Sequence, residues 1–310
     1  MKIIFMGTPD FAAKALESLD NAGHEIVLVV TQPDKEKGRG KQVSQSPVKE
    51  YAVAHNMNVF QPVKIREKEN VDYLKGFEAD ICVVAAFGQI LTEDILNMPK
   101  YGCVNIHASL LPKYRGAAPI QWSILNGEKQ TGVTIMQMDK GLDTGDMLLQ
   151  KAIDIEACDT GESLFDKLML LGSELICEAL VKIEKGELIP IRQNEAESTY
   201  AGKITKDMGL IDFSRDSEII ERYVRGLNSW PSAFTMINGK TLKIWKADIV
   251  KTESTEAPGS VIEVNSDAIV VKTGNGAISI KEIQLEGKKR MTVHDFLLGY
   301  KVAVGATLGK

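Results

Sequence analysis

The sequence lacks the residue patterns that metal sites and membrane spans require. Its four cysteines form no Cys-x-x-Cys pair, and its four histidines have no Cys or His partner at ligand spacing. No apolar run approaches the length of a transmembrane helix, and strand-like residues stand where a secreted protein would carry a signal peptide. We therefore expect a cytoplasmic protein with reduced cysteines, no metal and no membrane contact.

A dinucleotide-binding fingerprint is missing as well. The first predicted strand is followed by Met6-Gly-Thr-Pro-Asp10, which lacks the Gly-x-Gly-x-x-Gly spacing that lets a backbone approach a pyrophosphate. NAD binding is therefore disfavoured. The net charge of −5 argues against a broad basic surface, so binding to nucleic acid would depend on a local patch.

The pattern of the first half predicts an α/β fold. Strand-like and helix-like segments alternate, which is typical of a doubly wound, mostly parallel, Rossmann-like sheet. Thr8 is expected to cap the first helix, a second helix begins at Pro47, and a long amphipathic helix runs from Thr160 toward Lys185. At 310 residues the chain is long enough for two domains.

The second half changes character. Short alternating segments follow one another, with Asn238-Gly239 and Asn275-Gly276 as hairpin turns, and five such strands suit a small OB-like β-barrel. We predict an N-terminal catalytic domain at residues 1–189, a linker at 190–206 and a C-terminal barrel at 207–310.

A possible reactive site lies where a predicted strand ends. Residues 103–107 alternate like a strand, and Leu110-Leu111-Pro112 cannot continue it, so Asn105 and His107 end the strand on the same face. Asp143 lies in a glycine-bracketed turn that can return to the same edge. An amide, an imidazole and a carboxylate suit acyl transfer. Spacing alone favours an ordinary core histidine and a turn-capping aspartate.

Two loops add further candidates. The apolar loop Phe87-Gly88-Gln89-Ile90-Leu91 follows a buried strand and suits a flat heterocycle, although an ordinary strand-to-helix turn fits it equally well. The loop from Pro33 to Lys41 is basic, and for an arbitrary protein it would simply be a solvated surface loop. Its cations are Lys35, Lys37, Arg39 and Lys41.

Longer motifs carry a family resemblance. The run from His107 to Gln121, together with Gly141-Leu-Asp-Thr-Gly-Asp-Met147, closely resembles the folate-dependent formyltransferases that act on methionyl initiator tRNA. The match extends to Met6–Ala12, Thr199–Ala201 and Arg225–Pro231, so it covers nearly the full length. The resemblance implies a Rossmann-like domain followed by a five-stranded barrel, in agreement with the pattern above.

The resemblance also implies chemistry. Asn105, His107 and Asp143 align with the catalytic residues, and the formyl donor would be 10-formyltetrahydrofolate. Asn105 would donate to the oxyanion, while His107, oriented by Asp143, would protonate the leaving nitrogen. The expected folate contacts are Ser109, Leu110, Leu111 and Pro112, joined by Phe87, Gly88, Gln89 and Leu91 of the apolar loop.

The expected acceptor is the α-amine of methionine on initiator tRNA. In the family the basic loop reaches the tRNA acceptor stem, which gives Lys35, Lys37, Arg39 and Lys41 the role of tRNA contacts, and a monomer is expected. An amine on a sugar nucleotide is the alternative acceptor. A noncatalytic folate-binding or nucleic-acid-binding module would not need the Asn105, His107 and Asp143 trio.

Overall fold

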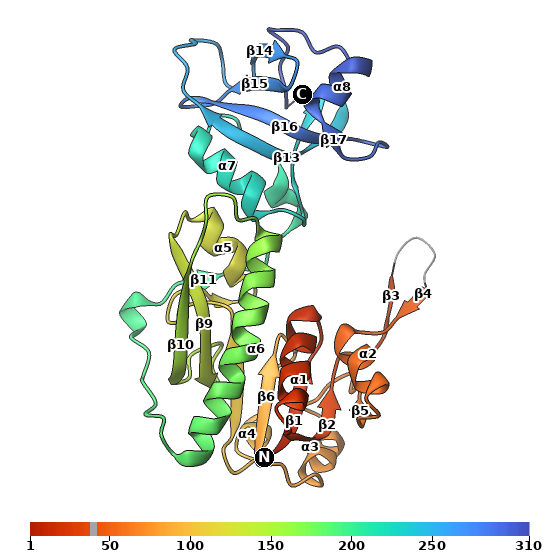
Figure 1. Cartoon of the computed structure of the whole chain (residues 1–310), viewed down its shortest axis with the longest axis vertical. Helices are drawn as coiled ribbons and strands as arrows, with labels where there is room; N and C mark the ends of the chain where they lie inside the picture. Colours follow the sequence, from red (N-terminus) through yellow and green to blue (C-terminus); the bar gives the residue numbers. More distant parts are fainter. Residues whose placement is uncertain (38–41, 310) are drawn as a thin grey trace. The chain divides into compact units, whose positions relative to one another are not determined.

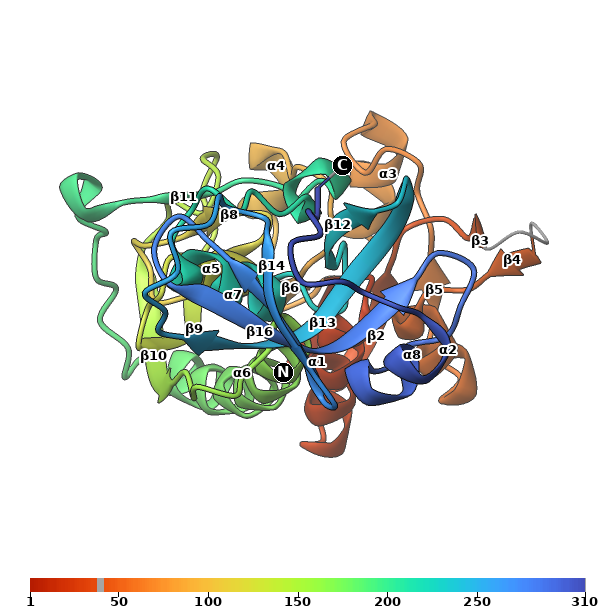
Figure 2. The ribbon, with the colours of Figure 1, turned by 90° about the horizontal axis from the view of Figure 1, so that it is seen from above.

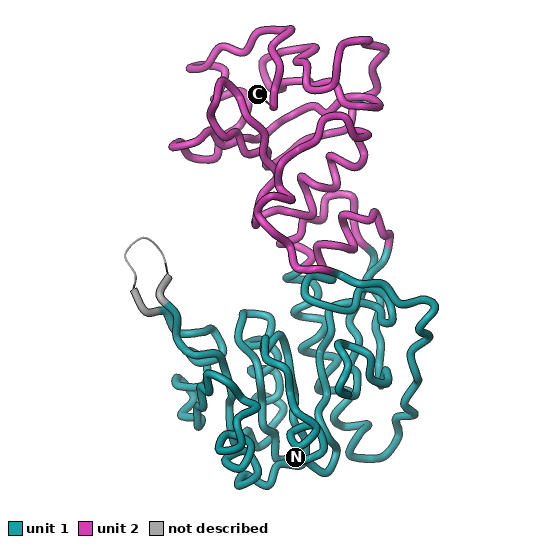
Figure 3. The backbone as a smooth tube through the Cα atoms, turned by 180° about the vertical axis from the view of Figure 1, so that it is seen from behind, with its two compact units in different colours: residues 1–119, 130–154, 165–201 teal, residues 120–129, 155–164, 202–310 magenta. Residues whose placement is uncertain are grey.

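The chain forms two compact units. The computed structural model describes residues 1–37 and 42–309. Unit 1 comprises residues 1–119, 130–154 and 165–201, and unit 2 comprises 120–129, 155–164 and 202–310 (Figure 3). Within the stretch expected to be a linker, residues 190–201 therefore group with unit 1 and residues 202–206 with unit 2. None of the described helices is both long and apolar enough to cross a membrane.

Unit 1 is built on a seven-stranded sheet in the order β10-β9-β7-β6-β1-β2-β5. The five strands from β7 to β5 run parallel, and β9 and β10 are antiparallel additions at one side. This confirms the predicted doubly wound, mostly parallel sheet. The strands are β1 (Lys2–Gly7), β2 (Glu25–Val30), β5 (Val59–Phe60), β6 (Ile81–Ala85), β7 (Cys103–His107), β9 (Gln130–Gln137) and β10 (Met147–Asp154).

Helices cover both faces of this sheet. The helix α1 (Asp10–Asn21) and the long α6 (Gly161–Lys185) lie over one face (Figure 1). Gly172 of α6 closely approaches Ile106 of β7. Because neighbouring residues of a strand point to opposite faces, Asn105 and His107 face away from α6.

The other face is covered by shorter helices. Side chains of α3 (Lys68–Lys75) and α4 (Glu93–Leu96) form a buried cluster with alternate residues of β1, β2 and β6 and with Cys103 at the start of β7. Since Asn105 and His107 share the face of Cys103, they lie beyond the end of this cluster, where loops replace helices. The helix α2 (Pro47–Ala54) packs against α1 instead.

One predicted helix cap is wrong. Pro9 occupies the N-cap of α1, which has no side-chain cap, and the Thr8 hydroxyl donates to the Phe87 carbonyl oxygen at 3.4 Å. The Thr8 hydroxyl, which a local pattern assigned to the helix, therefore bonds a carbonyl in the loop after the neighbouring strand β6. The start of α2 follows the expected chemistry, because the Ser46 hydroxyl accepts from the backbone N–H of Lys49 at 3.1 Å.

Unit 2 contains the predicted β-rich domain. Its strands pair antiparallel in the order β12-β13-β16-β15-β14, with β17 beside β16, and β13 and β16 run along each other (Figure 2). The strands are β12 (Ala233–Ile237), β13 (Lys240–Val250), β14 (Val261–Asn265), β15 (Ala268–Lys272), β16 (Ala277–Leu285) and β17 (Met291–Thr292). Positive φ angles at Asn238, Gly239 and Gly276 confirm the two hairpin turns.

Three helices accompany this sheet. The helices α7 (Ser217–Gly226) and α8 (Val293–Gly299) bury apolar side chains such as Val224 and Phe296 in the same cluster as Leu242 and Ile280 of the strands. The third, α5 (Pro119–Leu125), contributes Ile124 and Leu125, which lie close to Gly226 at the end of α7. The domain thus has a hydrophobic core of its own.

Gly7, at the turn between β1 and α1, gives a test of the packing in unit 1. A Cβ on Gly7 would lie 2.5 Å from the Ala12 Cβ and 2.9 Å from the Ala85 oxygen, so Gly7→Ala should reduce the free energy of unfolding by about 1–3 kcal/mol. Urea denaturation measures the change. Gly76→Ala is the control, because the nearest atom to its Cβ would be 3.4 Å away. Equal unfolding midpoints for the two variants would contradict this account.

Candidate active site

The three predicted catalytic residues lie in unit 1, two of them on β7. Asn105 pairs in register with Val84 of β6 and Met136 of β9, and His107 pairs with Thr134 of β9. Asp143 lies in the loop between β9 and β10. The carboxyl ends of parallel strands are the usual place for a ligand in such sheets. The structure therefore confirms the strand end and brings the Asp143 loop to the same edge.

His107 is a buried imidazole with a partner on each side. Its side chain is 6% exposed, and its Nε2 lies 2.9 Å from the carbonyl oxygen of Tyr114. A carbonyl only accepts hydrogen bonds, so Nε2 must be the donor. The other nitrogen, Nδ1, lies 3.7 Å from Oδ2 of Asp143, which is an ion-pair distance too long for a hydrogen bond. Among the described residues, Nδ1 is thus the ring nitrogen without a hydrogen-bond partner.

Asp143 is held in an unusual backbone conformation. Its φ is +54°, in the left-handed region that residues with a side chain seldom adopt. Its carboxylate is 14% exposed, and Oδ2 accepts from the backbone N–H of Gly116 at 2.8 Å. The start of the loop is closed by Asp139, whose Oδ1 accepts from Gly141 N at 2.9 Å and from the Thr144 hydroxyl at 2.6 Å.

The amide of Asn105 is unengaged. Among the described residues no hydrogen bond to its side chain is found, although the residue is half buried and shares the face of His107. Amide groups this close to a core are normally paired. An amide without a protein partner, beside an imidazole and a carboxylate, suits a donor to a substrate oxygen.

The segment after β7 is fixed by β9 and β10. The Thr134 hydroxyl donates to the Ser109 carbonyl at 2.7 Å and accepts from Leu111 N at 3.1 Å, while Gln150 Nε2 donates to the Leu111 carbonyl at 2.9 Å. Ser109 and Leu111 are buried, whereas Leu110 and Pro112 are partly exposed. Of the four folate contacts predicted in this segment, Leu110 and Pro112 therefore present side-chain surface.

The apolar loop after β6 presents backbone more than side chains. Phe87 and Leu91 belong to the core cluster, and Gln89 bonds the backbone of Pro62 and Ile65. Gly88 is exposed with a φ of +80°. A folate contact of this loop thus stays a prediction, and Gly88 is the predicted residue that is open to it.

The predicted tRNA contacts are described only in part. Lys35, which is exposed, and Lys37 lie in β3 (Lys35–Lys37), which pairs antiparallel with β4 (Gln42–Ser44). Arg39 and Lys41 fall outside the described residues. The hairpin leaves β2 on the way to α2, and its tRNA role stays a prediction.

The segment after α6 contributes residues that the sequence patterns did not indicate. The buried Gln193 accepts from Arg115 Nε at 3.0 Å and donates to the carbonyls of Asp143 and Gly145 at 2.9 and 2.7 Å. Glu195 bonds both terminal nitrogens of Arg115 at 2.9 Å. Farther on, β11 (Tyr200–Ala201) pairs in parallel with β8 (Arg115–Gly116) (Figure 2).

The Arg115–Glu195 ion pair shifts the pKa values of both partners. Hydrogen bonds from the guanidinium hold the pKa of Glu195 below its usual range, and the carboxylate raises the pKa of Arg115 in turn. The Arg115 side chain is nearly buried, but that of Glu195 is 69% exposed. Solvent therefore screens much of the attraction, and the pair serves mainly to orient the arginine.

The sequence matches known protein families in both its N-terminal and its C-terminal part. A family described as formyl transferase matches residues 1–180, and one described as formyl transferase, C-terminal domain, matches residues 203–301. The chain belongs to the formyl transferase family. Its relatives include the methionyl-tRNA formyltransferase of Agathobacter rectalis, 52% identical over 99% of both chains, and that of Alkaliphilus oremlandii, 50% identical over the whole of both.

Solved structures with the same fold are more distant. WlaRD, a sugar 3N-formyl transferase, shares 22% identity and a TM-score of 0.66 over 93% of this chain and 99% of its own. HypX from Aquifex aeolicus, solved with tetrahydrofolic acid, shares 18% identity and a TM-score of 0.62 over 96% of this chain and 47% of its own. At these identities the likeness shows the fold alone.

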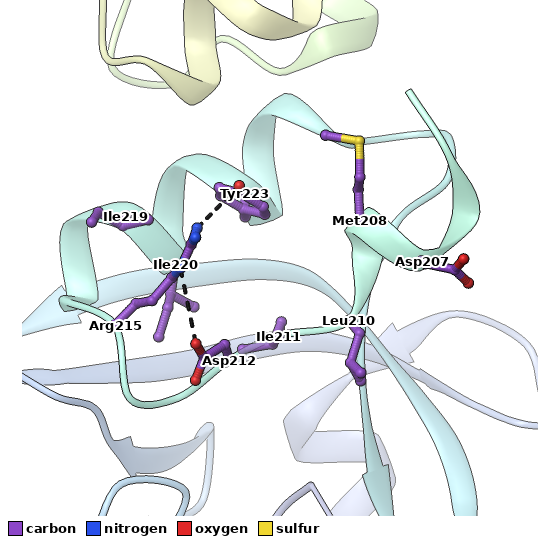
Figure 4. Close-up of a pocket in the computed structure, with 9 residues that line it drawn as sticks. All are labelled: Asp207, Met208, Leu210, Ile211, Asp212, Arg215, Ile219, Ile220 and Tyr223. Carbon is purple, nitrogen blue, oxygen red and sulfur yellow. Dashed lines mark hydrogen bonds and ion pairs between the residues drawn. The ribbon is translucent and has the colours of Figure 1, made fainter. Parts of the chain in front are cut away.

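Besides this site, three kinds of feature could carry chemistry: a cluster of metal ligands, the buried cysteines and a hollow in unit 2. Among the described residues no three His, Cys, Asp or Glu side chains are grouped as metal ligands. Cys82 and Cys103 are buried neighbours on β6 and β7, where their hydrogen bond, together with burial, raises the pKa of Cys82. A hollow in unit 2, between Asp207 and Tyr223, has none of the predicted site residues in its lining, and its Arg215 bonds the Tyr223 hydroxyl at 3.1 Å (Figure 4).

Replacing Glu195 with Gln should give a pH-dependent loss of stability. A depressed folded-state pKa stabilises the fold fully above the unfolded value of about 4.3, and this contribution disappears as the pH falls through the folded value. Glu195→Gln should therefore lower the free energy of unfolding slightly at pH 7, and the gap to the unaltered protein should narrow at pH 3.5. Denaturant titrations at both pH values measure the gap.

Glu187→Gln is the matched control, because Glu187 is exposed and no ion pair of it is found among the described residues. It should show no gap at either pH. A Glu195→Gln gap that stays constant or widens in acid would contradict the assigned ion pair.

Proposed function

We propose that the chain transfers the formyl group of 10-formyltetrahydrofolate to the α-amine of methionine esterified to initiator tRNA, giving N-formylmethionyl-tRNA. The observation that carries this proposal is identity of about half of all residues, over the full length, with proteins named methionyl-tRNA formyltransferase. The presence of Asn105, His107 and Asp143 around one sheet edge supports it chemically. Since the acceptor is an aminoacyl-tRNA, the enzyme would act in the cytoplasm, and we expect a monomer.

The reaction begins with attack of the neutral amine on the formyl carbon. A new C–N bond forms, and the formyl oxygen becomes an oxyanion on a tetrahedral carbon. The unengaged Asn105 amide would donate to this oxygen, and a preorganised donor of that kind contributes about 3 kcal/mol to the transition state. Its position on a central strand keeps it fixed during the reaction.

Collapse of the tetrahedral carbon breaks the bond to N10 of the folate. N10 gains a proton from the His107 ring, and the proton lost by the amine would return to that ring, so no net proton is consumed. Nδ1 of His107 is the ring atom without a hydrogen bond, so we assign it the proton delivered to N10. The Asp143 carboxylate beside Nδ1 stabilises the charged ring from which that proton leaves. Asp143 would act through His107.

Folate would lie along the segment after β7. Leu110 and Pro112 offer apolar side-chain surface for a flat ring, and the exposed backbone at Gly88 offers hydrogen bonds. Ser109 and Leu111 would shape the segment from beneath. The basic residues Lys35, Lys37, Arg39 and Lys41 would contact the acceptor stem of the tRNA, where lysines hold phosphates and Arg39 approaches a base edge.

A sugar-nucleotide amine is the second candidate acceptor, because WlaRD has the same fold over nearly its whole length. A single assay separates the two. The protein is incubated with 10-formyltetrahydrofolate and either charged initiator Met-tRNA or a dTDP-linked amino sugar, and each product is analysed by mass spectrometry. We expect the formyl group on methionine. Formylation of the sugar alone would overturn the proposal.

Replacing either catalytic residue should remove most of the activity. Asn105→Ala loses the oxyanion donor and His107→Ala loses the proton donor, so each should lower kcat roughly a hundredfold or more while folate binding is retained. Steady-state kinetics and folate binding by fluorescence measure the two effects. His55→Ala, at the exposed residue that caps the C-terminus of α2, should leave both unchanged. Near-normal turnover in either site variant would refute the assigned roles.

Arg39→Ala tests the tRNA contact. Loss of one guanidinium contact to nucleic acid costs about 1–3 kcal/mol, so the KM for Met-tRNA should rise roughly tenfold and its salt dependence should weaken. The KM for the formyl donor should not change. Arg66→Ala removes an exposed arginine outside the loop and serves as the control. An unchanged KM and kcat in Arg39→Ala would exclude this contact.

A further inference from the structure

The segment 193–201, which follows α6, bonds the backbone of both residues whose polar groups flank the His107 ring. We call it the connector. One flanking group is the Asp143 carboxylate at Nδ1, and the other is the Tyr114 carbonyl at Nε2. Each belongs to a residue with a left-handed backbone, since φ is +54° at Asp143 and +62° at Tyr114. Such conformations persist only where surrounding bonds impose them.

Gln193 imposes the conformation of the Asp143 loop. Both N–H bonds of its side-chain amide are used, one to the carbonyl of Asp143 and one to that of Gly145. Its oxygen accepts from Arg115, so the amide is fully satisfied although the residue is only 4% exposed. No other type of side chain offers two donors and one acceptor in this geometry except asparagine, which is one methylene shorter.

Thr199 holds the second flanking residue. Its hydroxyl accepts from the backbone N–H of Tyr114 at 2.8 Å, and its carbonyl accepts from Arg115 N at 2.9 Å. The ladder continues with Ala117 N, which donates to the Ala201 carbonyl at 2.9 Å. The connector thus adds a short strand to the segment that carries the carbonyl partner of His107.

We propose that Gln193 and Thr199 are positioning residues for formyl transfer. Gln193 places the Asp143 carboxylate and Thr199 places the Tyr114 carbonyl, so that the imidazole is held between them with Nδ1 toward the substrate. Neither residue needs to touch folate or the acceptor. The connector lies between the two segments matched by the family, 1–180 and 203–301, and this role rests on the proposed function.

The test uses substitutions that keep shape and change hydrogen bonding. Gln193→Glu turns both donors into acceptors that face two carbonyl oxygens, and Thr199→Val removes the acceptor of the Tyr114 N–H. Each should lower kcat tenfold or more, since small misplacements of reacting groups cost up to a hundredfold, while the KM for 10-formyltetrahydrofolate changes less than twofold. Thr199→Ser keeps the hydroxyl and should retain at least half of kcat.

Asn194→Ala is the matched control. Asn194 is the connector residue next to Gln193, and among the described residues its side chain bonds only Ala196 and Glu197, so kcat should stay within twofold. Circular dichroism and the melting temperature establish that each variant is folded. If Gln193→Glu does not fold, the Thr199→Val and Thr199→Ser pair decides alone.

A folded Thr199→Val with normal kcat, or a Thr199→Ser variant as impaired as Thr199→Val, would overturn the positioning role. All variants are assayed with whichever acceptor the unaltered protein formylates. Failure of the unaltered protein on Met-tRNA therefore contradicts the proposed function, whereas equal kcat values among the variants contradict this inference.

Discussion

The site depends on the single carboxylate oxygen Oδ2 of Asp143, which lies 2.8 Å from the Gly116 N–H and 3.7 Å from Nδ1 of His107. A hydrogen bond from a backbone N–H to a charged acceptor is stronger than one between neutral groups. It ties the segment after β7 to the loop between β9 and β10. The carboxylate that lies beside Nδ1 of His107 is therefore also a structural link between these two segments.

Burial strengthens the electrostatic interactions of His107 and Asp143, but it also requires that every charge there has a partner. Charges in a poorly solvated site interact more strongly than in water, but an unpaired buried charge is costly. His107 meets that condition because a charged ring would find the Tyr114 carbonyl at one nitrogen and the Asp143 carboxylate at the other. Both ring nitrogens already face polar groups, so the proton transfer of the proposed function would need no rearrangement of those groups.

Sequence patterns over a few neighbouring residues predicted those elements of the fold that such neighbours determine. Alternation identified β7 and the strands of unit 2, and Asn-Gly pairs located two hairpins because few other residues adopt their backbone angles. Gln193 was missed, and Thr199 was noted only through the family resemblance, since their hydrogen-bond partners lie up to 85 residues away and a polar segment without periodicity indicates a linker. Thr8 was assigned wrongly as a cap for the same reason, because its acceptor, Phe87, is 79 residues distant.

This contrast bears on where the catalytic domain ends. The alternation of strand and helix stops with α6 at Lys185, so a boundary drawn from pattern falls near residue 189. A domain cut there would lose the amide that bonds the Asp143 and Gly145 carbonyls and the hydroxyl that bonds Tyr114 N. Leaving those backbone groups without protein partners would let two strained loops relax. The backbone pairing with the segment after β7 therefore reaches Ala201, twelve residues beyond that boundary.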